Sequence, residues 1–146
     1  AARERHLLDR PQPRVSLGQA LKAYATACID ISDGLLADLG HVLKASDCGA
    51  RLDVEVLPFD DSLAGLEADK RWRYQLSGGD DYELLFTLPP VHAELLEDLS
   101  RRLDIGLTII GEIEAGPGVR CVRSDGAVYE PQGKGFEHFR QNSGNQ

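Results

Sequence analysis

The segment at residues 30–34, with the sequence Asp-Ile-Ser-Asp-Gly, places two carboxylates and a hydroxyl between an apolar stretch and a helical pattern. In an extended chain the side chains of Asp30 and Ser32 point to one side, whereas Asp33 enters the first turn of the following helix. Close carboxylates repel each other unless a cation or water lies between them, and Mg²⁺ prefers such oxygen ligands. Free N–H groups at a helix N-terminus also stabilise phosphate. The segment is therefore a candidate site for Mg²⁺ and phosphate, and helix capping by Ser32 or Asp33 is the structural alternative.

The segment at residues 77–82, with the sequence Ser-Gly-Gly-Asp-Asp-Tyr, is the second candidate site. Adjacent glycines let the backbone approach a ligand closely. Alternation along the strand that follows places Asp81 and Glu83 on one face and Asp80 on the other. The alternative is a tight turn whose acidic side chains are solvated.

The histidines and cysteines add no catalytic set that spacing alone supports. His41 and His138 have no partner at the spacing of metal ligands, and no P-loop pattern occurs in the sequence. The three cysteines, Cys28, Cys48 and Cys121, are odd in number and form no C-x-x-C pair. This usage predicts a reduced cytosolic protein without a disulfide or metal framework.

The composition is that of an ordinary globular protein. The chain has 146 residues, of which 42% are hydrophobic and 27% charged, and this fits one domain. Its formal net charge of −8 argues against binding nucleic acid through phosphates, which requires a basic face. No apolar run approaches the roughly 20 residues that span a bilayer. The composition thus predicts an acidic, soluble, cytoplasmic protein with no nucleic-acid or membrane partner.

Three amphipathic patterns, and a helix expected within the mixed segment at residues 59–75, predict the helices that position these segments. Ser16 is expected to be the N-cap of the first helix. In the second helix, Asp38 is expected to lie away from the apolar stripe, and in the third either Trp72 or Tyr74 is expected to pack inward. The helical patterns lie at residues 16–25, 35–47, 71–74 and 91–103.

Short runs of alternating or β-branched residues predict the strands, and helices interleave with them. An Asp-Gly pair at residues 125–126 predicts a hairpin. The predicted fold class is α+β, with a mixed, mostly antiparallel sheet and helices packed on it. The strands are expected at residues 27–29, 52–56, 84–88, 107–113, 119–123 and 127–130.

Four segments occur in an order that is specific, although each segment alone is not. They are Ile-Asp-Ile-Ser-Asp-Gly-Leu at 29–35, Gly-Gly-Asp-Asp-Tyr-Glu-Leu at 78–84, Ile-Gly-Glu-Ile at 110–113 and Gly-Phe-Glu-His-Phe at 135–139. In this combination the chain resembles the C-terminal domain of the thiamine-monophosphate kinase family, over nearly its whole length. The resemblance implies the fold shared by aminoimidazole ribonucleotide synthetase-like C-terminal domains.

The resemblance also implies a domain organisation. Residues 1–15 would be a linker from a missing N-terminal domain, 16–140 the C-terminal kinase domain and 141–146 a disordered tail. In this family the N-terminal domain supplies most metal ligands, much of the ATP site and the interface of the homodimer. The isolated chain is therefore expected to be inactive.

The family's reaction transfers the γ-phosphoryl group of ATP to thiamine monophosphate, giving thiamine diphosphate, with several Mg²⁺ ions. Such transfer depends mainly on positioning and charge neutralisation, which suits clustered aspartates. By match to the family, Asp30 and Asp33 would be Mg²⁺ ligands and Ser32 would contact the ATP phosphates.

The resemblance implies a thiamine-binding role for three further residues. Asp80 would lie by the thiamine moiety, and Phe136 would stack on or beside one of its rings. The family usually has glutamate at the position of Asp80, and neighbouring Asp81 is the second candidate for this contact. Two alternative functions stay open: another ATP-dependent enzyme of the superfamily, such as selenophosphate synthetase or a hydrogenase-maturation relative, and a non-catalytic interaction module.

Overall fold

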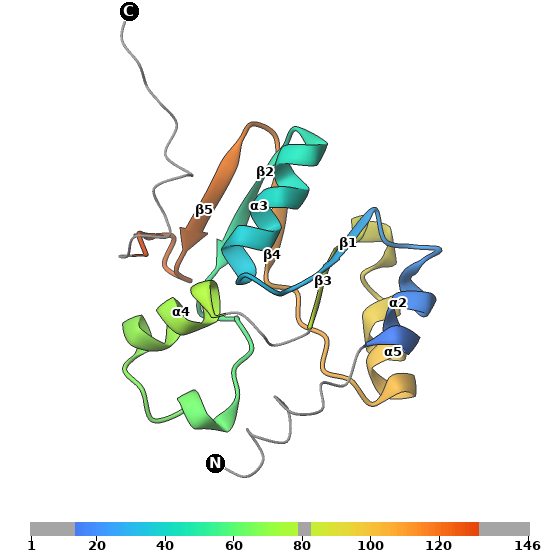
Figure 1. Ribbon diagram of the computed structural model, residues 1–146, viewed down its shortest axis with the longest axis horizontal. Coiled ribbons are helices and arrows are strands. Elements are labelled where there is room, and N and C mark those ends of the chain that lie inside the picture. The colour runs from blue at the N-terminus through green and yellow to red at the C-terminus, as the bar shows by residue number, and fades with distance from the viewer. Residues whose placement is uncertain (1–13, 79–82, 132–146) are drawn as a thin grey trace, which may run out of the picture.

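The computed structural model describes residues 14–78 and 83–131, and Figure 1 shows how their helices and strands are arranged. None of the helices in these two ranges is long and apolar enough to cross a membrane. The elements in chain order are α2 (Val15–Leu21), β1 (Ala27–Asp30), α3 (Leu35–Ser46), β2 (Gly49–Asp53), the 3₁₀ turn η1 (Asp61–Leu63), α4 (Ala68–Ser77), β3 (Leu84–Thr87), the 3₁₀ turn η2 (Pro90–His92), α5 (Leu95–Leu103), β4 (Gly111–Glu114), β5 (Gly118–Val122) and β6 (Val128–Tyr129).

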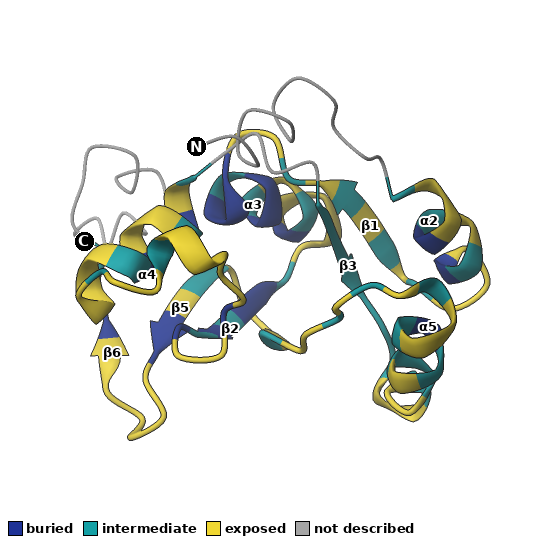
Figure 2. Ribbon diagram, turned by 90° about the horizontal axis from the view of Figure 1, so that it is seen from below, coloured by how far each residue is buried: buried dark blue, intermediate teal, exposed yellow. Residues whose placement is uncertain are grey.

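Strands β1 and β3 form a two-stranded antiparallel sheet in which Cys28 pairs with Phe86 and Asp30 with Leu84. Successive side chains of a strand point to opposite faces. Leu84 and Phe86 accordingly pack into the core beneath α2 and α5, whereas Leu85 packs into the core beneath α3. The two strands therefore form a wall between two cores, and Figure 2 shows α3 on one side of it and α2 with α5 on the other.

The larger core lies between α3, α4 and a four-stranded sheet with the strand order β4-β2-β5-β6. β2 is antiparallel to β4 and parallel to β5, and β6 is antiparallel to β5. Trp72 of α4 is buried and contacts Tyr129 edge-on at 5.2 Å between ring centroids. Each large apolar side chain buried in this way contributes roughly 1.5–3 kcal/mol before entropy is counted. Because the leucines of α3 are buried against this sheet, the position of the first turn of the helix is fixed relative to the sheet.

The predicted α+β class with mostly antiparallel pairing is confirmed, and the described strands divide between two sheets. The hairpin predicted at the Asp-Gly pair is also confirmed, because β5 pairs with β6 across it. Trp72 rather than Tyr74 packs inward, and Tyr74 is exposed.

Several local predictions are wrong. Ser16 lies inside α2, which begins at Val15 and has no side-chain cap, and this helix ends at Leu21 rather than residue 25. The strand predicted at 52–56 ends at Asp53, because the Asp53 carboxylate accepts the N–H of Glu55 and turns the chain.

The strand predicted at 107–113 begins only at Gly111. The preceding segment passes between the two cores, since Leu107 packs into the core beneath α5 and Ile110 into the core beneath α3. Residues 107–110 thus connect the two cores and form no strand, although the carbonyl of Ile110 accepts the N–H of Asp53.

We expect the free energy of unfolding to fall at alkaline pH because of Cys121. Burial raises the pKa of this thiol from 9.0 to about 11. The unfolded chain then loses the proton at a lower pH than the folded chain does. Stability that is present below pH 9 is lost as the pH rises through 11, by about 2–3 kcal/mol in total. Urea denaturation across this range measures the slope.

The variant Cys121→Ala is the control for this prediction, because it removes the thiol and leaves Tyr129 in place. Burial also raises the pKa of the Tyr129 hydroxyl, so part of the alkaline slope stays in both proteins. A slope that is the same in the variant as in the unchanged chain would show that Cys121 does not cause it.

Candidate functional site

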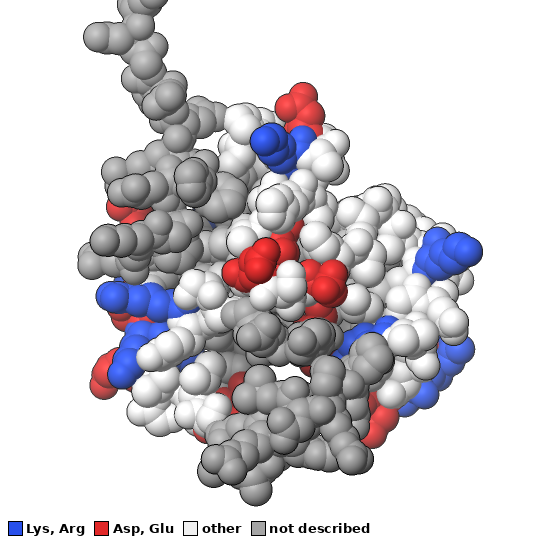
Figure 3. All heavy atoms as spheres, viewed as in Figure 1, with Lys and Arg blue, Asp and Glu red and all other residues white. Residues whose placement is uncertain are grey.

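The turn at residues 31–34 joins the end of β1 to the start of α3. Gly34 has φ 110° and ψ 151°, a backbone conformation that is essentially restricted to glycine. The side chains of Asp30, Ser32 and Asp33 are exposed around this turn. Figure 3 shows acidic side chains near the centre of the face where β1 and α3 meet. The sequence prediction that this segment bends between a strand and a helix is confirmed.

A buried carboxylate, which the sequence pattern predicts to lie away from the apolar stripe, stabilises this turn. Asp38, in the first turn of α3, is 3% exposed, and its Oδ2 accepts the backbone N–H of Ser32 at 2.8 Å and of Asp33 at 3.0 Å. The expectation that Asp38 lies away from the apolar stripe is therefore wrong. The sequence holds a signal for this, because Asp38 follows Leu35 by three residues and so shares the face that points to the core.

Capping by Ser32 or Asp33 is not observed. α3 has Gly34 as its N-cap and no hydrogen bond from a capping side chain. The hydroxyl of Ser32 and the carboxylates of Asp30 and Asp33 form no hydrogen bond or ion pair within the part of the chain that the structure describes. These oxygens are therefore free to bind a ligand from solvent.

Described residues on either side of positions 79–82, in the second candidate segment and just after it, contact the turn. At the start of the segment, the backbone of Ser77 packs on Gly34 so closely that a Cβ there would lie 3.0 Å from the Ser77 carbonyl carbon and oxygen. Just after the segment, the N–H of Ile31 donates to the carbonyl of Glu83 at 2.8 Å. Ser77 and Glu83, which lie on either side of residues 79–82, thus both contact the turn.

Three predicted site residues lie outside the described residues. Asp80 and Asp81 fall between the two described ranges, and Phe136 follows the second of them. Their roles toward thiamine stay predictions.

Glu83 differs from the aspartates of the turn, because it is already engaged. Its carboxylate accepts two hydrogen bonds from Arg14, at 2.7 Å from Nη2 and 3.0 Å from Nε. This paired geometry raises the pKa of the Arg14 guanidinium. The pair joins the residue that precedes α2 to the start of β3, close to Ile31, so Glu83 supports the site and does not offer a free ligand.

The donor set at the turn fits Mg²⁺. Mg²⁺ in phosphate-binding sites is usually held by one or two carboxylates, and water and phosphate oxygens complete its shell. Asp30 and Asp33 supply two such carboxylates, both exposed. No group of three or more His, Cys, Asp or Glu side chains within residues 14–78 and 83–131 is arranged to hold a metal ion. A Mg²⁺ ion bound here would therefore need further oxygen ligands besides Asp30 and Asp33.

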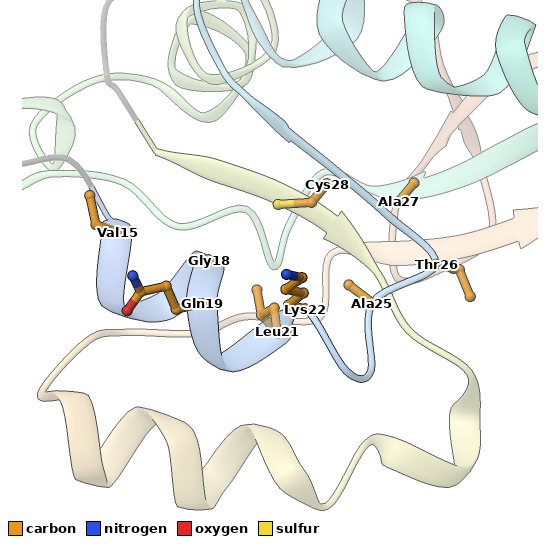
Figure 4. Close-up of a pocket in the computed structure, with 9 residues that line it drawn as sticks. All are labelled: Val15, Gly18, Gln19, Leu21, Lys22, Ala25, Thr26, Ala27 and Cys28. Carbon is orange, nitrogen blue, oxygen red and sulfur yellow. The ribbon is translucent and has the colours of Figure 1, made fainter.

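A groove of about 550 Å³ lies next to β1, between the strand and α2. Figure 4 shows the side chains of Leu21, Lys22 and Cys28 along it. Burial, and secondly the negative charge of Asp30, raise the pKa of the Cys28 thiol. A protonated thiol is a weak nucleophile, so the groove adds no activated cysteine to the site.

Comparison with known proteins shows which family this chain belongs to. Residues 3–123 match the family described as AIR synthase related protein, C-terminal domain, and the chain belongs to this family. Within it, the chain is similar to thiamine-monophosphate kinases. It is 45% identical over 137 residues to the Escherichia coli K12 enzyme, and the match covers 93% of this chain but 42% of that protein.

Solved structures agree with this similarity. The thiamine-monophosphate kinase of Stenotrophomonas maltophilia K279a matches with a TM-score of 0.76 and 44% identity, covering 86% of this chain and 39% of that one. AaThiL complexed with AMPPCP and TMP matches with a TM-score of 0.65 and 32% identity, covering 87% and 38%. The predicted fold and the resemblance to this family's C-terminal part are both confirmed. The chain spans less than half the length of these relatives.

Proposed function

We propose that this chain is the C-terminal half of a thiamine-monophosphate kinase of thiamine biosynthesis. In the whole enzyme it would help to transfer the γ-phosphoryl group of ATP to the phosphate of thiamine monophosphate. The observation that carries the proposal is the pair of exposed carboxylates, Asp30 and Asp33, which no described residue binds, on a turn that Asp38 and the backbone of Ser77 contact. The similarity to thiamine-monophosphate kinases over 93% of the chain, and the AMPPCP and TMP bound in AaThiL, support the assignment of substrates.

Asp30 and Asp33 would bind Mg²⁺, which when bound neutralises negative charge on the phosphates that react. Ser32 would contact the ATP phosphates through its hydroxyl, because its backbone N–H already donates to Asp38. No protein nucleophile is required, since an oxygen of the thiamine monophosphate phosphate attacks the γ-phosphorus and ADP leaves. The residues of the turn therefore act by binding and orienting phosphates.

Asp80, or Asp81 in its place, and Phe136 would bind thiamine. This part of the proposal depends on the match of these residues to the family's motifs. It is supported by described residues on either side of this segment, because the backbone of Ser77 packs on Gly34 and the carbonyl of Glu83 accepts the N–H of Ile31.

An N-terminal domain would complete the site and form a homodimer. The relatives extend well beyond the matched region, and two carboxylates alone leave most of a Mg²⁺ shell to other ligands. We further propose a cytoplasmic location, which the three free cysteines support because such thiols persist in a reducing compartment.

A chimera tests the proposed function. The matching segment of the Escherichia coli enzyme, 45% identical, would be replaced by this chain. We expect the chimera to form thiamine diphosphate from thiamine monophosphate in a reaction that needs both ATP and Mg²⁺, and the isolated chain to show negligible turnover. A chimera that folds but is inactive would favour another ATP-dependent reaction or a non-catalytic role. Robust turnover by the isolated chain would contradict the need for an N-terminal domain.

A further inference from the structure

We infer that Asp38 is the positioning residue that sets the metal affinity of the turn, although it touches neither metal nor substrate. The inference rests on the proposed function, because it assumes that Asp30 and Asp33 bind a divalent cation. It goes beyond that function because it proposes that a side chain of α3, outside the turn, sets the arrangement of these two ligands. Asp38 acts on the turn through its hydrogen bonds, its burial and its charge.

A single carboxylate oxygen of Asp38 fixes two consecutive peptide groups. Oδ2 accepts the N–H of Ser32 at 2.8 Å and of Asp33 at 3.0 Å. Both N–H groups then point toward the core, and the side chains of these two residues remain at the surface. The same contacts leave neither N–H free for phosphate, so the turn presents carboxylate and hydroxyl oxygens outward.

Asp38 is itself fixed by the packing of α3. Its neighbours Leu35, Leu36 and Leu39 are each 3–5% exposed in the larger core. A carboxylate on a packed helix has few rotamers available, so its hydrogen bonds hold the turn in a fixed position relative to α3. The opposite side of the turn is fixed by the backbone of Ser77 on Gly34.

The charge of Asp38 also matters. Hydrogen bonds from N–H groups to an ionised carboxylate are about twice as strong as those between neutral groups. Asp38 has no ion-pair partner within residues 14–78 and 83–131. Its negative charge, close behind Asp33, therefore adds to the field that favours a cation at the turn.

The experiment compares Asp38→Asn with Leu43→Ala in the chimera. Asparagine keeps the shape of the side chain but removes the charge, whereas Leu43 is buried in the same helix far from the turn. For Asp38→Asn we expect the Mg²⁺ concentration at half-maximal activity to rise about 10- to 100-fold. The KM for thiamine monophosphate should stay nearly unchanged. Leu43→Ala should change the thermal stability but not the Mg²⁺ dependence.

A second readout separates this inference from the proposed function. Electron paramagnetic resonance would measure Mn²⁺ binding to the chimera in the presence of a non-hydrolysable ATP analogue, with no turnover needed. Weaker Mn²⁺ binding in Asp38→Asn supports the positioning role even if the chimera proves to have another activity. Equal Mn²⁺ binding in the variant and the unchanged protein overturns it.

A third variant covers the case in which Asp38→Asn does not fold. Asp38→Glu keeps the charge and displaces the carboxylate by one methylene group, and we expect an intermediate loss of Mn²⁺ affinity. An affinity equal to that of the unchanged protein, in a variant whose acceptor oxygen has moved, would contradict the inference.

Discussion

Replacing Asp30 and Asp33 together by asparagine should lower the ATP-dependent phosphorylation of thiamine monophosphate by the chimera about a thousandfold. Both carboxylates are exposed at the turn, and neither is engaged by another described residue. Without them the turn loses two negatively charged oxygen ligands, and it would bind Mg²⁺ beside the phosphates far more weakly. Rates of thiamine diphosphate formation at saturating and limiting Mg²⁺ measure the effect.

A matched control for this double variant is available on the same chain. Asp47 and Asp104 end α3 and α5 in the left-handed conformation, with φ 50° and 52°. Asparagine tolerates that conformation well, so Asp47→Asn with Asp104→Asn removes the same charge from exposed sites away from the turn. We expect this control to keep near-normal rates. If the double variant at the turn also retained normal Mg²⁺-driven turnover, the proposed function of these aspartates would be refuted.

Gly34→Ala should lower the free energy of unfolding by about 3 kcal/mol. The backbone at Gly34 has φ 110° and ψ 151°, which strains any residue with a side chain. The new methyl group would also lie 3.0 Å from the carbonyl carbon and oxygen of Ser77. These atoms are backbone at the end of α4, so relief requires movement of the helix or of the turn. Urea denaturation of the chain measures the loss.

Gly65→Ala is the control for the effect of adding a methyl group to a glycine. Gly65 has no atom within 4 Å of the added position and no positive φ. We expect a change of less than about 0.5 kcal/mol there. An equally small change at Gly34 would mean that the turn adapts freely to the added methyl group. This would contradict the inference that the backbone of the turn is held in one conformation.

Much of the element order could be predicted from the sequence, because apolar periodicity reports burial directly. The helix over α3 and the strand at β3 follow from their apolar residues, and both are confirmed. The errors fall where tertiary packing overrides local pattern. Residues 107–110 are rich in β-branched side chains, yet their partners lie in two different cores, and no local pattern contains that information.

The candidate site residues could be singled out from the sequence, whereas the contacts that hold the turn could not. Asp30 and Asp33 stand out because free acids next to glycine ahead of a helix suit a cation. Asp38 does not stand out in the sequence, because an amphipathic pattern predicts that charged residues face the solvent. In the structure its carboxylate instead accepts two backbone N–H groups beneath the turn. Its position among leucines of the apolar stripe was the available signal. Contacts between Arg14 and Glu83, 69 residues apart, could not be inferred from spacing.

The wall formed by β1 and β3 gives the two hydrophobic cores a common boundary. Leu85 faces one core and Phe86 the other, so loosening of either core shifts the same pair of strands. The aspartates of the turn stand at the end of β1 and just beyond it. We expect the whole described region to unfold cooperatively rather than in two steps, and the position of the turn to depend on the packing of both cores.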